Sequence, residues 1–506
     1  MIEVRSVEEV RAAEEAAFTK VPAGALMQRA AHALAVSCAR ILHEAAGGVA
    51  GSRVVLLVGS GNNGGDALWA GQRLAARGCR VDAIALSDRL HEEGAGALVR
   101  SGGRIHRWAG DAGQHRLIAD AHLVLDGILG IGGTGGLRPN AAEVADAALR
   151  SGAVIVAVDV PSGVDADTGQ VGGTAISADV TVTFGAVKPG LLLAPGRFHA
   201  GTVNLVDIGL EFDTRGDVMV LSGIDVDAWV PEPGEDDYKY RRGVAGVSAG
   251  SAAYPGACLL ATEGARHGNA GMVRFLDRSD GTAAMVLDHF PDVVVDGAPP
   301  ADQPRVTAWG CGSGYPGDAA DELAVRAVLA AEVPVVLDAG ALSLVAESSE
   351  IRAVVADRAS RGLPTVLTPH EGEFERLVPG LLDAASGRLD AARSAAERLH
   401  ATIVLKGPGT VVVDPAGPAA IDTEGTADLS TAGSGDVLMG ILAALLAGAW
   451  ARGAREPRLL TEAAAAAVWL HGRAGRKAAT SGPVTALDIT AALPAAVRAA
   501  RFGDTA

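Results

Sequence analysis

The ten residues from Thr431 to Gly440 combine a glycine-rich turn with a single acid, Asp436. An apolar run, 441–449, follows at once, so the turn is predicted to open a buried helix with Asp436 in its first turn. Backbone N–H groups and the helix dipole at such a start bind anions. A carboxylate there favours a base acting on a group that attacks a phosphate. The alternative is a plain helix cap, because Asp and Ser are ordinary cap residues.

A second glycine-rich stretch, Gly59-Ser60-Gly61-Asn62-Asn63-Gly64-Gly65-Asp66, follows a continuous apolar strand expected at 53–59. A helix is expected at 67–77. Strand, glycine loop and helix in this order are typical of the opening of a dinucleotide-binding fold. Two adjacent Asn and one Asp exceed what a turn requires, which favours a ligand site over a simple cap by Asp66.

Polar residues also end the other strands expected in the first half. Asp126 ends the strand at 121–126, and Asp159 follows the strand at 153–158. Lys188 lies in the loop after a strand at 178–184. Because open α/β sheets bind ligands at the carboxyl ends of their strands, these residues are better explained as one site than as separate caps.

The second half repeats this pattern, with polar strand ends at 310–314, 338–342, 368–373 and 405–410. Lys406 follows an apolar strand and precedes glycine, which favours phosphate contact over a surface lysine, although the P-loop spacing is absent. His370 stands between Pro369 and two acids, which indicates a loop and favours a site over a core histidine. Glu371 and Glu373 either bind magnesium indirectly or start a helix, and both alternatives stay open.

The length of 506 residues predicts two or three domains, and the regular alternation of strands and helices predicts mainly parallel, doubly wound sheets. Composition becomes Pro- and acid-rich between about 210 and 240. We therefore predict a first domain at 1–215, a linker at 216–240 and a second domain at 241–506. The alternative for the linker is a strand that docks onto the second domain.

The net charge of −17 argues against non-specific binding to nucleic acid or anionic membranes. The four scattered cysteines contain no CxxC pair and are expected to be buried and reduced. The acidic N-terminus is unlike a signal peptide, and no apolar run reaches membrane-spanning length. A cytoplasmic protein is the expectation, and we also expect a homo-oligomer.

Four motifs of the first half, VGSGNNGGDA, LDGILGIGGTGG, VDVPSG and FGAVKPG, resemble the epimerase domain of NAD(P)H-hydrate repair enzymes over about residues 1–210. The resemblance implies a Rossmann-like three-layer sandwich and K⁺ held by Asn63, Asp126 and Ser162, whose oxygen donors suit a hard cation. It implies that Asp159 contacts the nicotinamide end as acid or base. We infer that Lys188 is its electrostatic partner, the alternative being a surface lysine. The residues implied to bind the hydrated dinucleotide are Asn62, Asn63, Gly64, Gly65, Asp66, Gly130, Ile131, Gly132, Gly133, Thr134, Gly135 and Gly136.

The second half, about 225–500, resembles the ribokinase-like superfamily through AGSGDVLMG, and TPHEGE and LKGPGT narrow it to ADP/ATP-dependent NAD(P)H-hydrate dehydratases. The resemblance implies that Asp436 is the base and that Ala257, Gly314 and His370 line the hydrated dinucleotide. The residues implied to bind the adenine nucleotide are Lys406, Gly407, Pro408, Gly409, Thr410 and Gly435. Two departures stand out: KYRRG replaces an HKG-like entry, which leaves the role of 239–243 open, and Ser251 follows Gly250 where relatives often have a second glycine.

Together the resemblances imply a bifunctional repair enzyme, an isomerase and a lyase. The first domain would interconvert the R and S forms of hydrated NADH or NADPH. The second would dehydrate the S form with ADP or ATP, and Mg²⁺ is expected with the nucleotide. One alternative is a vitamin or sugar kinase fused to a Rossmann-like module. Another is a first half that only binds nucleotide or protein, although Asp126, Asp159 and Lys188 together argue against a pure binder.

Overall fold

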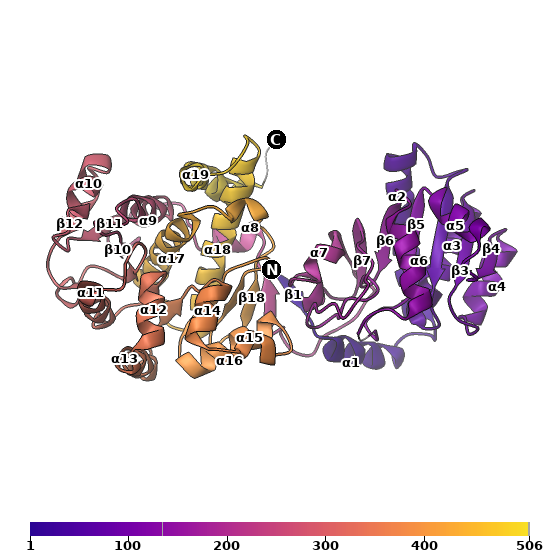
Figure 1. The fold of residues 1–506 in the computed structure, drawn as a ribbon, viewed down its shortest axis with the longest axis horizontal. Helices are drawn as coiled ribbons and strands as arrows, with labels where there is room; N and C mark the ends of the chain where they lie inside the picture. Colours follow the sequence, from indigo (N-terminus) through magenta and orange to yellow (C-terminus); the bar gives the residue numbers. More distant parts are fainter. Residues whose placement is uncertain (134, 504–506) are drawn as a thin grey trace. The chain divides into compact units, whose positions relative to one another are not determined.

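A computed structural model describes residues 1–133 and 135–503 and divides the chain into two compact units (Figure 1). The N-terminal unit is Glu3–Gly216, and the C-terminal unit is Met1–Ile2 with Asp217–Ala506. The segment expected as a linker, 216–240, is therefore largely part of the C-terminal unit. Val218–Val220 forms the buried strand β9, which pairs in parallel with β18, because its apolar side chains find a sheet edge to cover.

The N-terminal unit is built on seven parallel strands in the order β4-β3-β2-β5-β6-β7-β8. The strands are β2 (Arg53–Val58), β3 (Arg80–Ala85), β4 (Arg104–Arg107), β5 (Leu123–Gly127), β6 (Val154–Val158), β7 (Val180–Phe184) and β8 (Thr202–Val206). The helices are α1 (Val7–Phe18), α2 (Ala25–Ala46), α3 (Asn62–Ala76), α4 (Glu92–Arg100), α5 (Ala112–Ala119), α6 (Pro139–Leu149), η1 (Pro189–Leu191) and α7 (Arg197–Ala200).

Alternate residues of β2 enter two separate cores of this unit, which makes a three-layer sandwich. Leu56 packs with side chains of α2 and α3, whereas Leu57 packs with side chains of α5 and α6. Successive strand residues point to opposite faces, so a strand buried on both sides reads as an unbroken apolar run. The predicted Rossmann-like sandwich is confirmed for this half of the chain.

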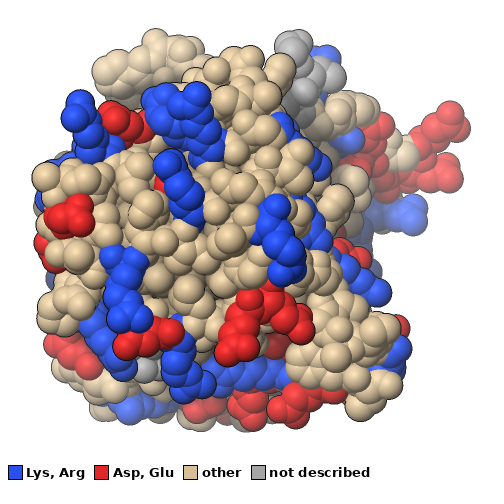
Figure 2. Space-filling view, turned by 90° about the vertical axis from the view of Figure 1, so that its right-hand side faces the viewer, with Lys and Arg blue, Asp and Glu red and all other residues tan. Residues whose placement is uncertain are grey.

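Charged groups on the surface of the N-terminal unit are mixed. Figure 2 shows basic and acidic side chains interspersed over one face, with uncharged residues filling most of its middle. Several of the unit's surface charges stand in pairs, for example Arg107 with Asp88 at 2.6 Å and Lys20 with Glu211 at 2.6 Å. Such exposed pairs contribute little stability, and the mixture is typical of a solvated face.

Ten strands of the larger sheet lie wholly in the C-terminal unit, in the order β9-β18-β17-β16-β15-β14-β13-β10-β11-β12. β17 is antiparallel to both of its neighbours, β16 and β18, and the other pairs are parallel. The strands after β9 are β10 (Val244–Ser248), β11 (Met272–Leu276), β12 (Val294–Asp296), β13 (Ala308–Cys311), β14 (Val335–Leu337), β15 (Thr365–Leu367), β16 (Thr402–Leu405), β17 (Val411–Val413) and β18 (Ala419–Ile421).

Helices cover both faces of this sheet, as in a doubly wound fold. Val336 enters a core with α9, α17, α18 and α19. Its two neighbours in β14, Val335 and Leu337, are fully buried as well, on the opposite face. The helices are α8 (Gly223–Asp227), α9 (Gly256–His267), α10 (Thr282–His289), η2 (Pro300–Asp302), α11 (Ala319–Leu329), α12 (Gly340–Glu347), α13 (Ser349–Ser360), α14 (Glu371–Leu377), α15 (Leu381–Ala384), α16 (Arg388–Leu399), η3 (Ala427–Leu429), α17 (Ser434–Ala451), α18 (Pro457–Ala479) and α19 (Ala486–Phe502).

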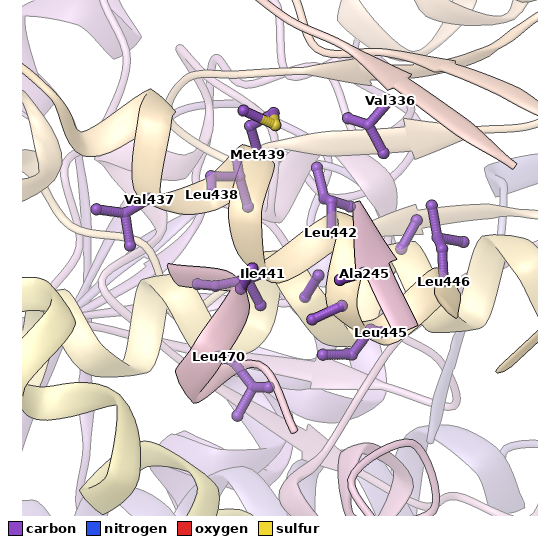
Figure 3. Packing of buried hydrophobic residues seen from close by; sticks show 14 of the residues in the cluster. Ala245, Val336, Val437, Leu438, Met439, Ile441, Leu442, Leu445, Leu446 and Leu470 are labelled. Atoms are coloured by element: carbon purple, nitrogen blue, oxygen red, sulfur yellow. The ribbon is translucent and has the colours of Figure 1, made fainter. Parts of the chain in front are cut away.

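Helix α17 forms the centre of the C-terminal unit (Figure 3). Its apolar side chains, among them Ile441 and Leu445, radiate into the core in all directions. Contrary to the expectation that no apolar run reaches membrane-spanning length, α17 is long and apolar enough to cross a membrane, alone among the described helices. However, 78% of it is buried inside the unit. A helix that is apolar all round is typical of a protein core, and α17 is such a helix.

Two glycines let α9 and α17 approach closely. A Cβ on Gly440 would lie 2.1 Å from the carbonyl oxygen of Ala261, and one on Gly264 would lie 2.4 Å from that of Val437. Both obstacles are backbone atoms, which cannot rotate away. The two helices therefore cross where each lacks a side chain, and this contact fixes the start of α17 relative to the sheet.

Replacing Gly440 by Ala tests this contact. Alanine stabilises an open helix position by about 1 kcal/mol relative to glycine, but overpacking a core costs about 1–3 kcal/mol. We expect Gly440→Ala to lower the melting temperature of the C-terminal unit in scanning calorimetry of the full chain. Gly256→Ala, at a helical position with nothing within 4 Å of the added Cβ, is the matched control and should not lower it. Equal stability of Gly440→Ala and the native chain would contradict the packing described.

Candidate active sites

Asp159 lies directly after β6 in the N-terminal unit and has a left-handed backbone, with φ 65°. Its Oδ1 atom accepts hydrogen bonds from Lys188 Nζ at 2.6 Å and Thr183 Oγ1 at 3.0 Å, and from the Phe184 amide at 3.2 Å. Lys188 is fully buried, so it is not a surface lysine. A left-handed conformation is costly for a residue with a side chain and persists where the surroundings hold it.

Two further carboxyl groups act electrostatically on this pair. Burial, followed by the charges of Asp159 and Glu14, raises the pKa of Asp66 well above its usual range. Burial and the charge of Asp159 also raise the pKa of Glu14, on α1. Asp66 Oδ1 is buried without a hydrogen-bond partner among the described residues. Burial therefore favours the protonated form of Asp66, which also has an unused polar atom in the site.

Glu14 was not predicted as a site residue. It belongs to an acidic run of an amphipathic helix, and nothing in that run distinguishes it from Glu15. Only the fold shows that Glu14 is half-buried whereas Glu15 is exposed.

The predicted start of the helix after the glycine loop was wrong by five residues. α3 begins at Asn62, so Asn62 to Asp66 form its first turns rather than a loop. Gly64 permits this, since a Cβ there would lie 2.3 Å from the Gly59 carbonyl oxygen. The start of the helix therefore packs directly on the end of β2, and its free N–H groups face the strand ends.

Asn63, Asp126 and Ser162 come together around the backbone of Leu129. Ser162 Oγ donates to Asp126 Oδ1 at 2.6 Å and accepts from the Leu129 amide at 2.9 Å. Asn63 Nδ2 donates to the Leu129 carbonyl at 2.8 Å, and this leaves Asn63 Oδ1 toward Gly130, where a Cβ would lie 2.9 Å away. Burial raises the pKa of Asp126 to about 6, against the hydrogen bonds from Ser162 and Ile128. Oxygen donors around a cradle that a Cβ would fill fit a hard cation.

The predicted binding loop 130–136 lies beside this cluster. Gly133 N donates to Gly130 O at 2.9 Å, Ile131 is half-buried, and Gly132, Gly135 and Gly136 are exposed. Gly136 packs closely on Gly172, since a Cβ on Gly136 would lie 3.0 Å from the Gly172 carbonyl oxygen. Thr134 lies outside the described residues.

In the C-terminal unit, Asp436 lies in the first turn of α17, after Gly433 in the left-handed conformation. Burial and then the charge of Asp338 raise the pKa of Asp436 to about 6, while a hydrogen bond with Ser313 and the charge of Lys406 oppose the shift. Gly435 is next to both groups, since a Cβ there would lie 3.4 Å from Lys406 Nζ and 3.7 Å from Asp338 Oδ2. Asp338, Lys406, Gly435 and Asp436 thus form one cluster at the start of α17.

Asp338 organises this cluster, although it was not predicted as a site residue. Its Oδ1 accepts from Lys406 Nζ at 2.8 Å and from Thr368 Oγ1 at 2.6 Å, and its Oδ2 accepts from Ser313 Oγ at 3.2 Å. It ends β14, which places it at the shared edge of the sheet. Its position at a strand end was visible in the sequence, but its contact with Lys406 was not.

His370 and Glu373 begin α14 beside this cluster. His370 Nδ1 accepts from the Gly372 amide at 3.0 Å, and Glu373 Oε2 accepts from the His370 amide at 2.9 Å, which completes a capping box. The His370 side chain is 58% exposed, so it is free to meet a ligand, and Glu373 Oε2 lies 3.7 Å from Lys406 Nζ. Both Glu371 and Glu373 lie in the first turn of the helix, as in the simpler of the two alternatives.

Arg388 contacts the backbone of the loop from Lys406 to Thr410. One Arg388 nitrogen donates to the Lys406 carbonyl at 3.0 Å, and a Cβ on Gly407 would lie 2.7 Å from it. Thr410 Oγ1 donates to the Gly407 carbonyl at 3.0 Å and closes the turn, which spans Pro408 and Gly409.

Ala257 and Gly314 are adjacent, since a Cβ on Gly314 would lie 2.6 Å from the Ala257 Cβ. The Ser251 hydroxyl donates to the Gly314 carbonyl at 2.8 Å. Serine in place of a second glycine therefore bonds to the predicted binding loop and does not obstruct it.

Two family profiles match the chain. The profile described as YjeF-related protein N-terminus matches residues 23–190, and the one described as NAD(P)H-hydrate dehydratase matches residues 245–495. Among solved structures, the ADP/ATP-dependent NAD(P)H-hydrate dehydratase from Bacillus subtilis, co-crystallised with ATP/Mg²⁺, is 27% identical. That similarity covers 56% of this chain and 98% of the other, with a TM-score of 0.45.

Proteins with both parts are similar over nearly the whole length. A bifunctional NAD(P)H-hydrate repair enzyme from Mycobacterium tuberculosis is 43% identical over 447 residues, 87% of this chain and 88% of the relative. One from Mycobacterium leprae is 41% identical over 483 residues, 94% of each. An NAD(P)H-hydrate epimerase from Microbacterium testaceum is 42% identical over 221 residues, 43% of this chain and 83% of that protein. The resemblance of both halves is thereby confirmed, and the chain belongs to the family of bifunctional NAD(P)H-hydrate repair enzymes.

Proposed function

We propose that each unit carries one step of the repair of hydrated NADH and NADPH. The N-terminal unit interconverts the R and S hydrates, and the C-terminal unit removes water from the S form with ADP or ATP. The observation that carries this proposal is Asp436, a half-buried carboxyl with a pKa raised to about 6 at the start of a helix. A base next to several free backbone N–H groups suits the activation of a hydroxyl for phosphoryl transfer.

In the C-terminal unit, Asp436 would take the proton of the substrate hydroxyl, and the oxygen would then receive the terminal phosphoryl group of the nucleotide. N–H groups of Gly433 to Gly435 would hold the charge that develops on this group. Phosphate is a far better leaving group than hydroxide, so its departure restores the dihydronicotinamide. Lys406 would face the phosphates, because its ammonium lies beside Gly435 and is fixed by Asp338. Mg²⁺ bound with the nucleotide would supply further positive charge.

In the N-terminal unit, Asp159 and Asp66 would take opposite roles. Lys188 and two other donors stabilise the ionised Asp159, which can accept a proton from the substrate. Burial raises the pKa of Asp66 and so favours its protonated form, which would donate a hydrogen bond through its unpartnered oxygen. Two carboxyl groups in different environments often divide base and acid roles. A K⁺ ion held by Asn63, Asp126 and Ser162 would supply positive charge that orders the loop after β5.

We also infer a cytoplasmic location, which the four free, buried cysteines support, since thiols persist in a reducing compartment. A homo-oligomer without nucleic-acid or membrane partners remains the expectation, and light scattering with size-exclusion chromatography measures the oligomeric state.

Asp436→Asn separates the two activities. The substitution keeps the size and a polar group but removes the base, which contributes about 10²–10⁴-fold to a rate. We expect ADP-dependent recovery of dihydronicotinamide absorbance to fall by that factor, while chromatography shows R and S hydrates exchanging at the native rate. Loss of both activities would contradict independent sites.

The pH profile of dehydration reports on Asp436. Its carboxylate is the active form and its pKa is raised to about 6, so the rate should fall as pH decreases through 6. We expect kcat/KM to be flat above pH 7 and to fall about tenfold for each unit well below 6. A profile that stays flat down to pH 5 would show that Asp436 is not the base.

A double-mutant cycle tests whether the buried pair of Asp159 and Lys188 acts in epimerisation or only in stability. Lys188→Met leaves a buried carboxylate unpaired and should lower the free energy of unfolding by about 3–5 kcal/mol. Asp159→Asn combined with Lys188→Met removes both charges and should recover most of that stability. Epimerisation should stay lost in the double variant, and its return would show that the pair is only structural.

A further inference from the structure

A cavity of about 460 Å³ lies at the C-terminal end of α17, at the opposite end of the helix from Asp436. Arg241, Arg242 and Arg452 line it together with Asp237. The 16 residues from Asp436 to Arg452 correspond to about 24 Å along a helix, so the cavity is separate from the dehydration site. Two of its arginines belong to the KYRRG segment, to which the proposed reaction gives no role.

Glycines fix this segment on the end of α17. Gly243 has φ +90°, and a Cβ there would lie 2.5 Å from the carbonyl carbon of Ala447. A Cβ on Gly271 would lie 2.0 Å from the carbonyl oxygen of Lys239. The backbone that carries Arg241 and Arg242 is therefore held against the helix and the strand that follows α9.

The Arg242 guanidinium is oriented by a neutral partner. Its Nη2 donates to Asn269 Oδ1 at 2.8 Å and to the Asn269 carbonyl at 3.3 Å. Asn269 has φ 69°, and its Nδ2 donates to the Pro231 carbonyl at 3.2 Å. An amide orients a guanidinium without neutralising it, so the full positive charge of Arg242 faces the cavity.

Arg452 has no carboxylate within 4.0 Å among the described residues, and no hydrogen bond from its guanidinium is found there either. Its Nη1 lies over Gly448, 3.1 Å from the position that a Cβ would take there. Burial lowers the pKa of Arg452, and the charge of Asp237 partly opposes this. Arg241 lies 3.6 Å from Asp237, so three cations share one anion and the formal balance is +2.

Capping of α17 does not account for these arginines. The Gly448 and Trp450 carbonyls accept from the Arg452 amide, and the Ala449 carbonyl accepts from the Ala454 amide at 3.0 Å. The Ala447 carbonyl accepts from Thr307 Oγ1 at 3.0 Å. These carbonyl groups are satisfied without any of the three guanidinium groups, although cations are generally favoured at this end of a helix.

We propose that this cavity binds a small phosphorylated metabolite through Arg241, Arg242 and Arg452. Guanidinium groups pair with phosphate oxygens in bidentate fashion, and the volume is in the range of about 300–1,000 Å³ that is typical of metabolite pockets. This site is distinct from the N–H groups at the start of α17 that would hold the phosphoryl group of the nucleotide. It stands whether or not the dehydration mechanism is correct.

Calorimetric titration of the full chain with inorganic pyrophosphate at low salt tests the site. We expect Arg452→Gln and Arg241→Gln each to weaken binding at this site at least about tenfold, as expected for the loss of a charge-assisted hydrogen bond. Arg455→Gln is the matched control. Arg455 lies three residues after Arg452, but its guanidinium stacks on Trp450, 3.5 Å from the ring centroid. Its replacement should leave pyrophosphate binding unchanged.

The variant Lys406→Gln distinguishes binding at the start of α17 from binding in the cavity. It should weaken pyrophosphate binding at the start of α17 and leave the affinity of the cavity for pyrophosphate unchanged. Native dehydration rates in Arg452→Gln and Arg241→Gln show that both variants are folded. If the native chain binds no pyrophosphate, or if both variants bind it as the native chain does, the proposal is overturned. Parallel titrations with AMP and inorganic phosphate show whether a nucleoside part adds affinity.

Discussion

The dehydration site depends on how closely α17 packs on α9. Gly264 and Gly440 remove the side chains that would separate the two helices, and the first turn of α17 is thereby set beside the ends of β13 and β14. This position leaves Asp436 half-buried next to Asp338 and Lys406. A less buried helix start would leave Asp436 as an ordinary exposed acid, with a lower pKa and no advantage as a base.

In both units one lysine forms an ion pair with one of several neighbouring acids. In the N-terminal unit, Lys188 pairs with Asp159, and the pKa of Asp66 nearby is raised. In the C-terminal unit, Lys406 pairs with Asp338, and Asp436 has the raised pKa. In each case the strand ends of a parallel sheet bring several acids to one edge, and one cation cannot neutralise them all. The carboxyl group left without an ion pair is the one whose proton affinity is adjusted.

Much of the architecture could be predicted because the strands of both sheets are apolar runs buried on both faces. The two acids proposed as catalytic, Asp159 and Asp436, were visible as single acids in glycine-rich strand or helix junctions. Glu14 and the role of Asp338 could not be predicted, because they depend on which helix face or strand end meets which partner. The start of α3 was misplaced, and strand β9 was foreseen only as the alternative to a linker. Close glycine packing decides the first and a sheet edge decides the second, and neither is a property of the local sequence.

The most direct test of the account is to incubate the full chain with hydrated NADH and ADP. The account predicts that dihydronicotinamide absorbance recovers until both epimers are consumed, with one AMP and one phosphate formed for each NADH restored. Accumulation of a stable phosphorylated product without recovery of NADH would contradict it and indicate a kinase. Recovery that stops when only the S hydrate is exhausted would contradict the epimerase assignment of the N-terminal unit.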